Sequence, residues 1–208
     1  PAKAPVLPLD ALAHGTTDAN QIDRWKVTLK KGQRILIHCR AERIDSRADA
    51  SLILTDSQGK VLATSLNAIG RDPLLDFTAT ADGDYLVGVH DFLYNGGAEY
   101  GYLLTASTRP WIDAVFPPAG QEGQVLEATL LGRNLPGGSP GEGLTIDGQP
   151  LETVSLRIPV QAAEGAKPDP TTPARAVLPG FTFSHEGSNH VRIGIAAAPV
   201  VAEANDAD

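Results

Sequence analysis

Hydrophobic and polar residues alternate with a period of two along most of this chain. In the segment "DRWKVTLKKGQRILIHCRA", Trp25, Val27 and Leu29 occupy every second position between charged and hydroxyl residues. This is the pattern of a strand with one buried face and one face in solvent. After the turn "KKGQ" the same alternation runs from Ile35 to Cys39, so the segment predicts two strands in succession.

Turn signals at short intervals divide the following residues into further strands. The segment "SLILTDSQGKVLATS" holds two β-rich runs around residues 56–59, which predicts a hairpin. "PLLDFTATADGDYLVGVHD" repeats this form around residues 82–83, and "EYGYLLTAS" supplies a strand that a longer hairpin loop at 91–100 would join to the one before. No stretch has a convincing 3.6-residue period, so we predict an all-β protein made of antiparallel β-sandwiches.

A domain boundary is predicted near "STRPWIDAVFPPAG", where prolines punctuate the chain and a fresh series of strands begins. We therefore predict one sandwich at residues 1–108 and a second at residues 109–201. Within the second, "QAAEGAKPDPTTP" at residues 161–173 is rich in Pro, Ala and Gly and predicts a long flexible loop. The small and acidic residues 202–208 predict a disordered tail.

Composition narrows the classes of partner. The chain has 208 residues and a net charge of −8, from 25 acidic and 17 basic residues, with no basic cluster. Binding to a phosphate backbone needs concentrated Lys and Arg, so nucleic acid is not an expected partner. No apolar run approaches the ~20 residues that cross a bilayer, so no membrane span is predicted. One Cys excludes an internal disulfide and a multi-Cys zinc site.

Two stretches carry a resemblance to known families. The segments "DRWKVTLKKGQRILIHCRA", "DASLILTDSQGKVLA" and "ATADGDYLVGVHD" followed by "YGYLLTAS" resemble, in order and spacing, the bacterial pre-peptidase C-terminal (PPC) domain over residues ~14–107. This resemblance implies a jelly-roll-like β-sandwich of the kind appended to exported enzymes and large surface proteins.

The second stretch is "PWIDAVFPPAGQEGQVLEATLLGRNL", which together with "VRIGIAA" resembles an IPT/TIG-type immunoglobulin-like domain over residues ~110–198. The insertion at 161–173 departs from that family's pattern. The two resemblances imply a fragment of a large exported multi-domain bacterial protein, located outside the cell, on its surface or in the periplasm. The sequence contains no Met, so we expect the chain to start inside a longer product.

Candidate catalytic residues are few. His90 and Asp91 stand next to each other, but no Gly-x-Ser-x-Gly elbow supplies a nucleophile. His90 alternates with the apolar face of Tyr85, Val87 and Val89, so we expect it on the protein surface. The sequence therefore predicts that the protein is not an enzyme.

Candidate metal ligands come in two groups. His185 and His190 flank "EGSN" in a predicted hairpin, where they could be cross-strand neighbours that share a metal ion, although no third ligand is evident. Asp18, Asn20 and Asp23 cluster before the first strand and carry the oxygen donors that calcium prefers.

The resemblance implies calcium binding through acidic lead-in residues, as in some PPC domains, and we expect that lead-in to be truncated here. A second pair of carboxylates, Asp45 and Asp49, lies in a loop. We expect no cofactor, with calcium as the alternative to solvated loop carboxylates and turn caps.

The single Cys and the two Trp residues are predicted to lie in the hydrophobic core. Cys39 shares a strand face with apolar neighbours, which predicts an inert buried thiol. Trp25 and Trp111 take the apolar phase of a strand or stand at the domain junction, so core packing is expected for both.

The loop at 91–100 is the best candidate for a binding surface. Phe92 and Tyr94 offer aromatic rings, and Asn95, Gly96 and Gly97 form a turn that would let a ligand approach. The alternative is that the two rings fold back to cap the open end of the sandwich.

We therefore predict a non-catalytic accessory region that binds an extracellular polysaccharide or protein, or spaces neighbouring domains of the same polypeptide. The other hypotheses are a purely structural spacer with no ligand and, behind both, a hydrolase.

Overall fold

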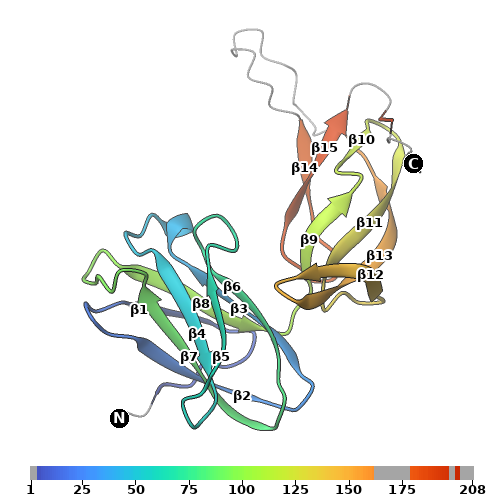
Figure 1. Ribbon diagram of the computed structural model, residues 1–208. Coiled ribbons are helices and arrows are strands. Elements are labelled where there is room, and N and C mark those ends of the chain that lie inside the picture. Colours follow the sequence, from blue (N-terminus) through green and yellow to red (C-terminus); the bar gives the residue numbers. More distant parts are fainter. Residues whose placement is uncertain (1–3, 162–178, 197–199, 202–208) are drawn as a thin grey trace, which may run out of the picture. The chain divides into compact units, whose positions relative to one another are not determined.

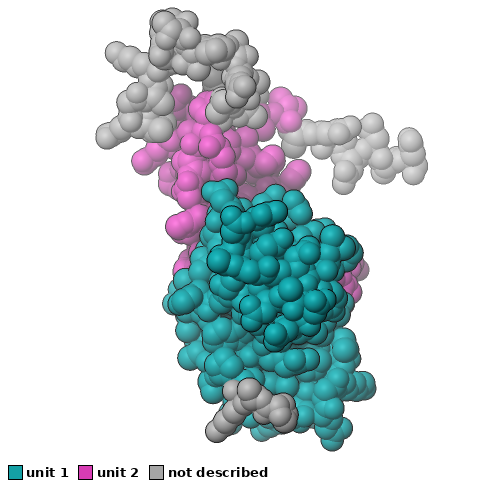
Figure 2. All heavy atoms as spheres, turned by 90° about the vertical axis from the view of Figure 1, so that its left-hand side faces the viewer, with its two compact units in different colours: residues 1–109 teal, residues 110–208 magenta. Residues whose placement is uncertain are grey.

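The computed structural model describes residues 4–161, 179–196 and 200–201. The chain divides into two compact units, Pro1–Arg109 and Pro110–Asp208 (Figure 2, teal and magenta). This division falls one residue beyond the boundary expected from the sequence.

The described residues form strands and a single short 3-10 helix, η1 (Glu42–Ile44), so the all-β class is confirmed. Apart from Gln161, the predicted loop at 161–173 lies outside the described residues, as does the predicted tail at 202–208. In the described part of the chain, no helix is long and apolar enough to cross a membrane.

The first unit contains two antiparallel four-stranded sheets that pack face to face (Figure 1). One sheet has the order β1 (Leu12–Thr16), β8 (Gly101–Ser107), β3 (Arg34–Arg40), β6 (Leu74–Thr78). The other has the order β2 (Asp23–Leu29), β7 (Gly83–Asp91), β4 (Ala50–Thr55), β5 (Val61–Leu66).

The core of this unit lies between the two sheets and follows the predicted alternation. Val27 and Leu29 on β2 are buried, as are Ile35, Ile37 and Cys39 on β3. Apolar residues that recur at every second position of a strand share one face, and burying that face is what holds the two sheets together.

The connections between strands differ from the prediction in two places. The β4–β5 hairpin at residues 56–59 is confirmed, because the two strands pair from Ser51 and Leu66 onwards. However, β7 pairs with β2 and β4, whereas β6 pairs with β3, and β8 pairs with β1 and β3. The hairpins predicted around 82–83 and 91–100 are therefore wrong.

Both of these turns cross from one sheet to the other. Phe77 before the first crossover and Tyr85 after it meet edge to face across the core, with ring centroids 5.5 Å apart. A turn signal marks where a strand ends, but it does not say whether the next strand pairs beside it or packs opposite it. Alternation is the same in both cases because each strand buries one face.

The second unit has a four-stranded antiparallel sheet and a three-stranded sheet in which one pair is parallel. The first has the order β12 (Ser139–Ile146), β13 (Gln149–Pro159), β11 (Val125–Arg133), β9 (Trp111–Phe116). The second has the order β10 (Ala119–Gln121), β15 (Val191–Ala196), β14 (Gly180–Phe183).

The core of the second unit consists of small clusters, one around Leu126, Ile158 and Ile193 and another around Ile112 and Leu130. The side chain of Asn189 supports the second cluster, because its amide both accepts from the backbone N–H of Ile112 at 2.6 Å and donates to its carbonyl at 2.9 Å.

Candidate functional site

The loop that follows β7 is organised by one carboxylate. Asp91 is 3% exposed, and its Oδ1 accepts hydrogen bonds from the backbone N–H groups of Leu93 at 3.1 Å and Asn95 at 2.9 Å. Its Oδ2 accepts from the N–H of Asp49 at 2.9 Å, and its carbonyl from the N–H of Tyr94 at 2.8 Å. A short Asp side chain that bonds the backbone ahead of it fixes a turn, so Asp91 holds this loop in one conformation.

Three consecutive apolar side chains stand on this turn. Phe92 is 51% exposed, Leu93 is 73% exposed and Tyr94 is 40% exposed. The sequence-based prediction included the two rings and omitted Leu93, which is the most exposed of the three. The signal was present, because three apolar residues in a row within a turn cannot obey strand alternation.

Tyr94 has a left-handed backbone conformation, with φ of 58°. The other described non-glycine residues with positive φ are Asp, Asn or Glu, and Asp and Asn reach this region more easily because their short polar side chains bond locally. A bulky aromatic residue gains no such bond. Strain of this kind, roughly 1–2 kcal/mol, is concentrated at functional sites in proteins.

The ring of Tyr94 covers His90. The two rings are stacked with centroids 4.4 Å apart and planes 7° apart, and the imidazole Nδ1 lies 2.8 Å from the carbonyl oxygen of Asp91. His90 is only 7% exposed, so its predicted surface position is wrong. Alternation correctly places it on the outer face of β7, but the pattern carries no information about a loop residue that folds back over that face.

The second half of the loop docks on the segment before β2. The N–H of Gly97 donates to the carbonyl of Thr17 at 2.9 Å, and the N–H of Asn20 donates to the carbonyl of Tyr94 at 2.9 Å. A Cβ on Gly96 would clash with backbone atoms of residues 18 and 19. The close approach that glycine permits here is therefore made by the chain's own backbone, and it is not left open for a ligand.

The loop is also tied to the segment that precedes β4. Arg47 forms an ion pair with Glu99 at 2.8 Å, its N–H donates to the Glu99 carbonyl at 3.0 Å, and its guanidinium lies 5.9 Å from the centroid of the Tyr100 ring. Both halves of the loop are thus anchored, and its exposed large apolar side chains are those at residues 92–94.

Comparison with known proteins assigns the central part of the first unit. Residues 21–91 match the family model of the bacterial pre-peptidase C-terminal domain. This segment is a PPC domain. PPC domains are non-catalytic accessory domains. The matched segment ends at Asp91, so the exposed residues 92–94 follow it directly. None of the curated proteins matches the chain.

Similar solved structures include the PPC domain of a collagenase from Bacillus anthracis, at 20% identity over 51% of this chain and 96% of that one, with a TM-score of 0.41. They also include PliG, a periplasmic inhibitor of g-type lysozyme, from Salmonella Typhimurium, at 16% identity over 50% of this chain and 99% of that one, with a TM-score of 0.33. PliG from Aeromonas hydrophila has 15% identity over 49% and 96%, again with a TM-score of 0.33.

The calcium candidates in the first unit already take part in hydrogen bonds within the fold. The Oδ2 of Asp23 accepts a hydrogen bond from the Tyr102 hydroxyl at 2.8 Å, and Tyr102 in turn accepts one from Trp25 Nε1 at 2.9 Å. Asp18 and Asn20 lie in the turn that docks the 91–100 loop. Among the described residues, no group of three or more His, Cys, Asp or Glu side chains could hold a metal ion. Calcium binding stays a prediction from the sequence.

The second pair of predicted calcium ligands, Asp45 and Asp49, has roles in the fold. Asp45 terminates the short helix η1 with a left-handed conformation. Asp49 forms an ion pair with Arg71 at 3.3 Å, in addition to its backbone bond to Asp91.

The two histidines of the second unit, His185 and His190, are not cross-strand neighbours. Pairing of β14 with β15 begins at Phe183 and Val191, so His185 and His190 both lie in the connecting loop. The cross-strand arrangement is therefore wrong. The N–H of His185 donates instead to the hydroxyl of Ser188 at 2.9 Å, which closes the turn.

Cys39 and Trp25 occupy the core as expected. Cys39 is fully buried, and this burial, with a further contribution from the Asp72 carboxylate, raises the pKa of its thiol. A thiol that stays protonated is a poor nucleophile. Trp25 packs against the core of the first unit, whereas Trp111, the first residue of β9, is half-buried.

Proposed function

We propose that this chain is a non-catalytic binding region of an exported bacterial protein and that Phe92, Leu93 and Tyr94 contact its partner. The proposed location is extracellular, cell-surface or periplasmic. The observation that carries the proposal is the exposure of three consecutive apolar side chains on a turn that Asp91 holds rigid. Loops on a rigid scaffold often carry binding, and a preordered turn loses little conformational entropy when it binds.

A protein partner is favoured because Leu93 is the most exposed of the three residues. An aliphatic side chain that projects from a turn fits an apolar pocket on a protein surface, and central apolar anchors of this kind dominate the binding energy of interfaces.

A polysaccharide is the second candidate. Tyr94 is held flat against His90 with nearly parallel rings and is still 40% exposed. A fixed, partly exposed aromatic ring offers the flat apolar area on which a sugar ring can lie.

The burial of His90 supports a non-catalytic role. The His90 imidazole, the candidate catalytic base from the sequence, is covered by the Tyr94 ring. The Nδ1 of His90 lies within hydrogen-bonding distance of the Asp91 carbonyl. A general base must reach the proton that it removes, and in this position His90 serves to support the ring above it.

The test is to probe the intact chain against an array of extracellular proteins and a glycan array. We expect a saturable partner, with binding weakened roughly ten- to a hundredfold by Leu93→Ser and by Phe92→Ala, as for an apolar anchor residue worth about 1–3 kcal/mol. Val61→Ser, which removes an apolar side chain of similar exposure on β5, is the matched control and should bind normally. If neither array yields a partner that these loop variants weaken, the chain is a spacer.

A further inference from the structure

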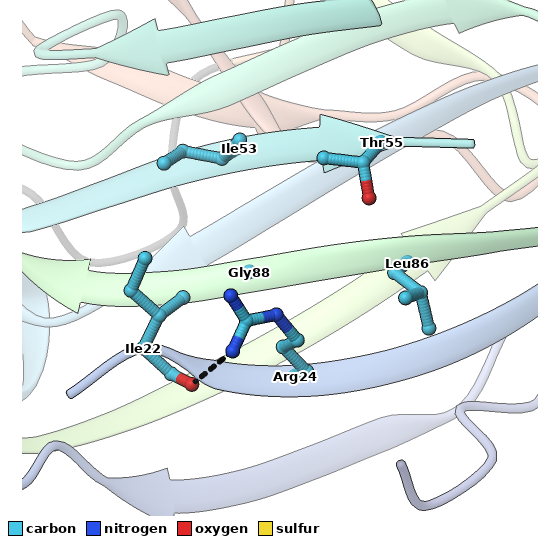
Figure 3. A pocket seen from close by; sticks show the side chains of 6 residues that line it. All are labelled: Ile22, Arg24, Ile53, Thr55, Leu86 and Gly88. Carbon is cyan, nitrogen blue, oxygen red and sulfur yellow. Dashed lines mark hydrogen bonds between the residues drawn. The ribbon is translucent and has the colours of Figure 1, made fainter. Parts of the chain in front are cut away.

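A small hollow lies on the outer face of the sheet formed by β2, β7, β4 and β5. It is lined by Ile22, Arg24, Ile53, Thr55, Leu86 and Gly88 (Figure 3). The register of the sheet explains the hollow, because Gly88 on β7 pairs with Arg24 on β2 and with Ile53 on β4. The floor between these two neighbours therefore has no side chain.

Gly88 is an unusual choice at this position. A glycine within a strand weakens the strand and often marks a place where another group approaches closely. A Cβ added here would lie 2.9 Å from the Cγ2 of Ile22 and at ordinary contact distances from Ile53. Ile22 is β-branched and stiff at χ1, so its methyl group would have to shift for alanine to fit, and glycine here makes room for the Ile22 side chain at the edge of the hollow.

The walls of the hollow consist of apolar side chains and the guanidinium group of Arg24. Ile22, Ile53 and Leu86 are all partly exposed. Within the described residues, the Arg24 guanidinium donates a single hydrogen bond, a long one of 3.5 Å, to the Ile22 carbonyl (Figure 3, dashed line). The neighbouring cation Lys26 differs, because it pairs with Asp84 at 3.0 Å.

We propose that this hollow binds one apolar side chain of an extended peptide, with a carboxylate of the same peptide on Arg24. The hollow is open to solvent and lined by six residues, so it encloses much less space than the roughly 300 Å³ or more of pockets for whole small molecules. It therefore suits a single side chain. Aliphatic walls select an apolar group, and Arg24 supplies the charge complementarity for an acidic one. No aromatic ring lines the hollow, which disfavours a sugar.

This inference stands on the hollow alone and does not depend on the exposed loop. The probes are three short peptides: acetyl-Leu-Ala-Asp-Ala-amide, its Asn counterpart, and acetyl-Ala-Ala-Asp-Ala-amide. In the first, Leu and Asp are two residues apart and so project from the same side of an extended chain. Binding is followed by NMR chemical shifts of the intact protein.

We expect saturable shifts at Ile22, Ile53, Leu86 and Gly88 with the first peptide. The Asn peptide should bind roughly two- to fivefold more weakly, the effect of one exposed ion pair, and the Ala peptide more weakly still. Arg24→Gln should remove the preference for Asp over Asn, whereas Lys26→Gln should leave it unchanged.

Gly88→Ala tests the cavity itself, because its added methyl group fills the floor. It should abolish binding of both Leu peptides, and circular dichroism checks that the fold is kept, because the new Cβ requires the Ile22 side chain to shift. Three results would overturn the proposal: no saturable shift at peptide concentrations up to about 10 mM, a preference for Asp that survives Arg24→Gln, or shifts of the same signals by oligogalacturonate but not by the peptides.

Discussion

Two turns of the first unit share one backbone design and carry opposite side chains. In the turn after β4, Asp56 Oδ1 accepts hydrogen bonds from the N–H groups two and four residues ahead, at 2.9 Å each, and its carbonyl accepts from the third. In the turn after β7, Asp91 does the same, at 3.1 and 2.9 Å. The third residue is left-handed in both, with φ of 87° at Gly59 and 58° at Tyr94.

The side chains on the two turns are Ser57, Gln58 and Gly59 in the first and Phe92, Leu93 and Tyr94 in the second. The first turn has the composition that its conformation favours, because glycine adopts positive φ without steric cost. The second places a strained tyrosine in the same position and exposes apolar surface. Since an equivalent backbone forms without apolar residues, the turn itself does not require Phe92–Tyr94, and a contact outside this chain is the physical reason we infer for them.

The largest effect is expected from transplanting one turn into the other. Replacing Phe92, Leu93 and Tyr94 by Ser, Gln and Gly should keep the fold, because the Asp91 bonds involve only backbone donors. Binding to the partner found on the arrays should fall by about a hundredfold or more, since apolar anchors contribute about 1–3 kcal/mol each. The measurement is a binding isotherm for each protein, with circular dichroism to check folding. Unchanged affinity in a folded variant would contradict a role for this turn in binding.

The two aspartates should differ in their contribution to stability. Asp91→Ala leaves three backbone N–H groups without their acceptor, including that of Asp49 on another segment, and should cost about 3 kcal/mol at roughly 1 kcal/mol for each bond. Asp56→Ala should cost about 1 kcal/mol, because both of its hydrogen bonds are exposed and water can replace the carboxylate.

Urea unfolding would measure this difference in the intact chain. A Trp111→Phe background leaves Trp25, in the first unit, as the only tryptophan, so its fluorescence reports the unit in which both turns lie. Equal destabilisation by the two substitutions would show that the crossover turn is no more firmly anchored than the hairpin.

The sequence predicts the strands well because burial of one face imposes a period of two. Val27 and Ile37 are buried as their alternation indicates. Which strands pair with each other is harder to predict from the sequence, because a crossover and a hairpin produce the same alternation of buried and exposed residues. For this reason the connection at 91–100 was predicted as a hairpin although it crosses between sheets. The burial of His90 depends on a contact with Tyr94 that only the folded loop creates.

Two parts of the candidate sites did leave a signal in the sequence. Leu93 stands between two aromatic residues in a turn, where an apolar residue has no strand face to occupy. Gly88 interrupts the β-rich run "DYLVGVHD", and an isolated glycine in a strand pattern suggests a close approach. The charge on the hollow could not be predicted, because it depends on the pairing of Lys26 with Asp84 and the long bond of Arg24.

The smallest effects are expected at the left-handed residues themselves. Tyr94→Gly should relieve roughly 1–2 kcal/mol of backbone strain and lose about 0.5–1.5 kcal/mol of ring stacking on His90, so the net change should lie between about 0.5 kcal/mol of stability lost and about 1.5 kcal/mol gained. Gly59→Ala is the matched control. Nothing lies within 4 Å of its Cβ, so no contact offsets the strain, and it should destabilise the first unit by about 1 kcal/mol.

Both values come from the same unfolding measurement, and the size of the stability change in Tyr94→Gly decides between the two interpretations of its ring. A near-neutral Tyr94→Gly variant means that the strained tyrosine contributes little net stability, which leaves binding as its role. A loss of more than about 2 kcal/mol, above the range for one aromatic pair, would mean that the ring is a structural cap over His90. The spacer hypothesis would then be favoured for this loop.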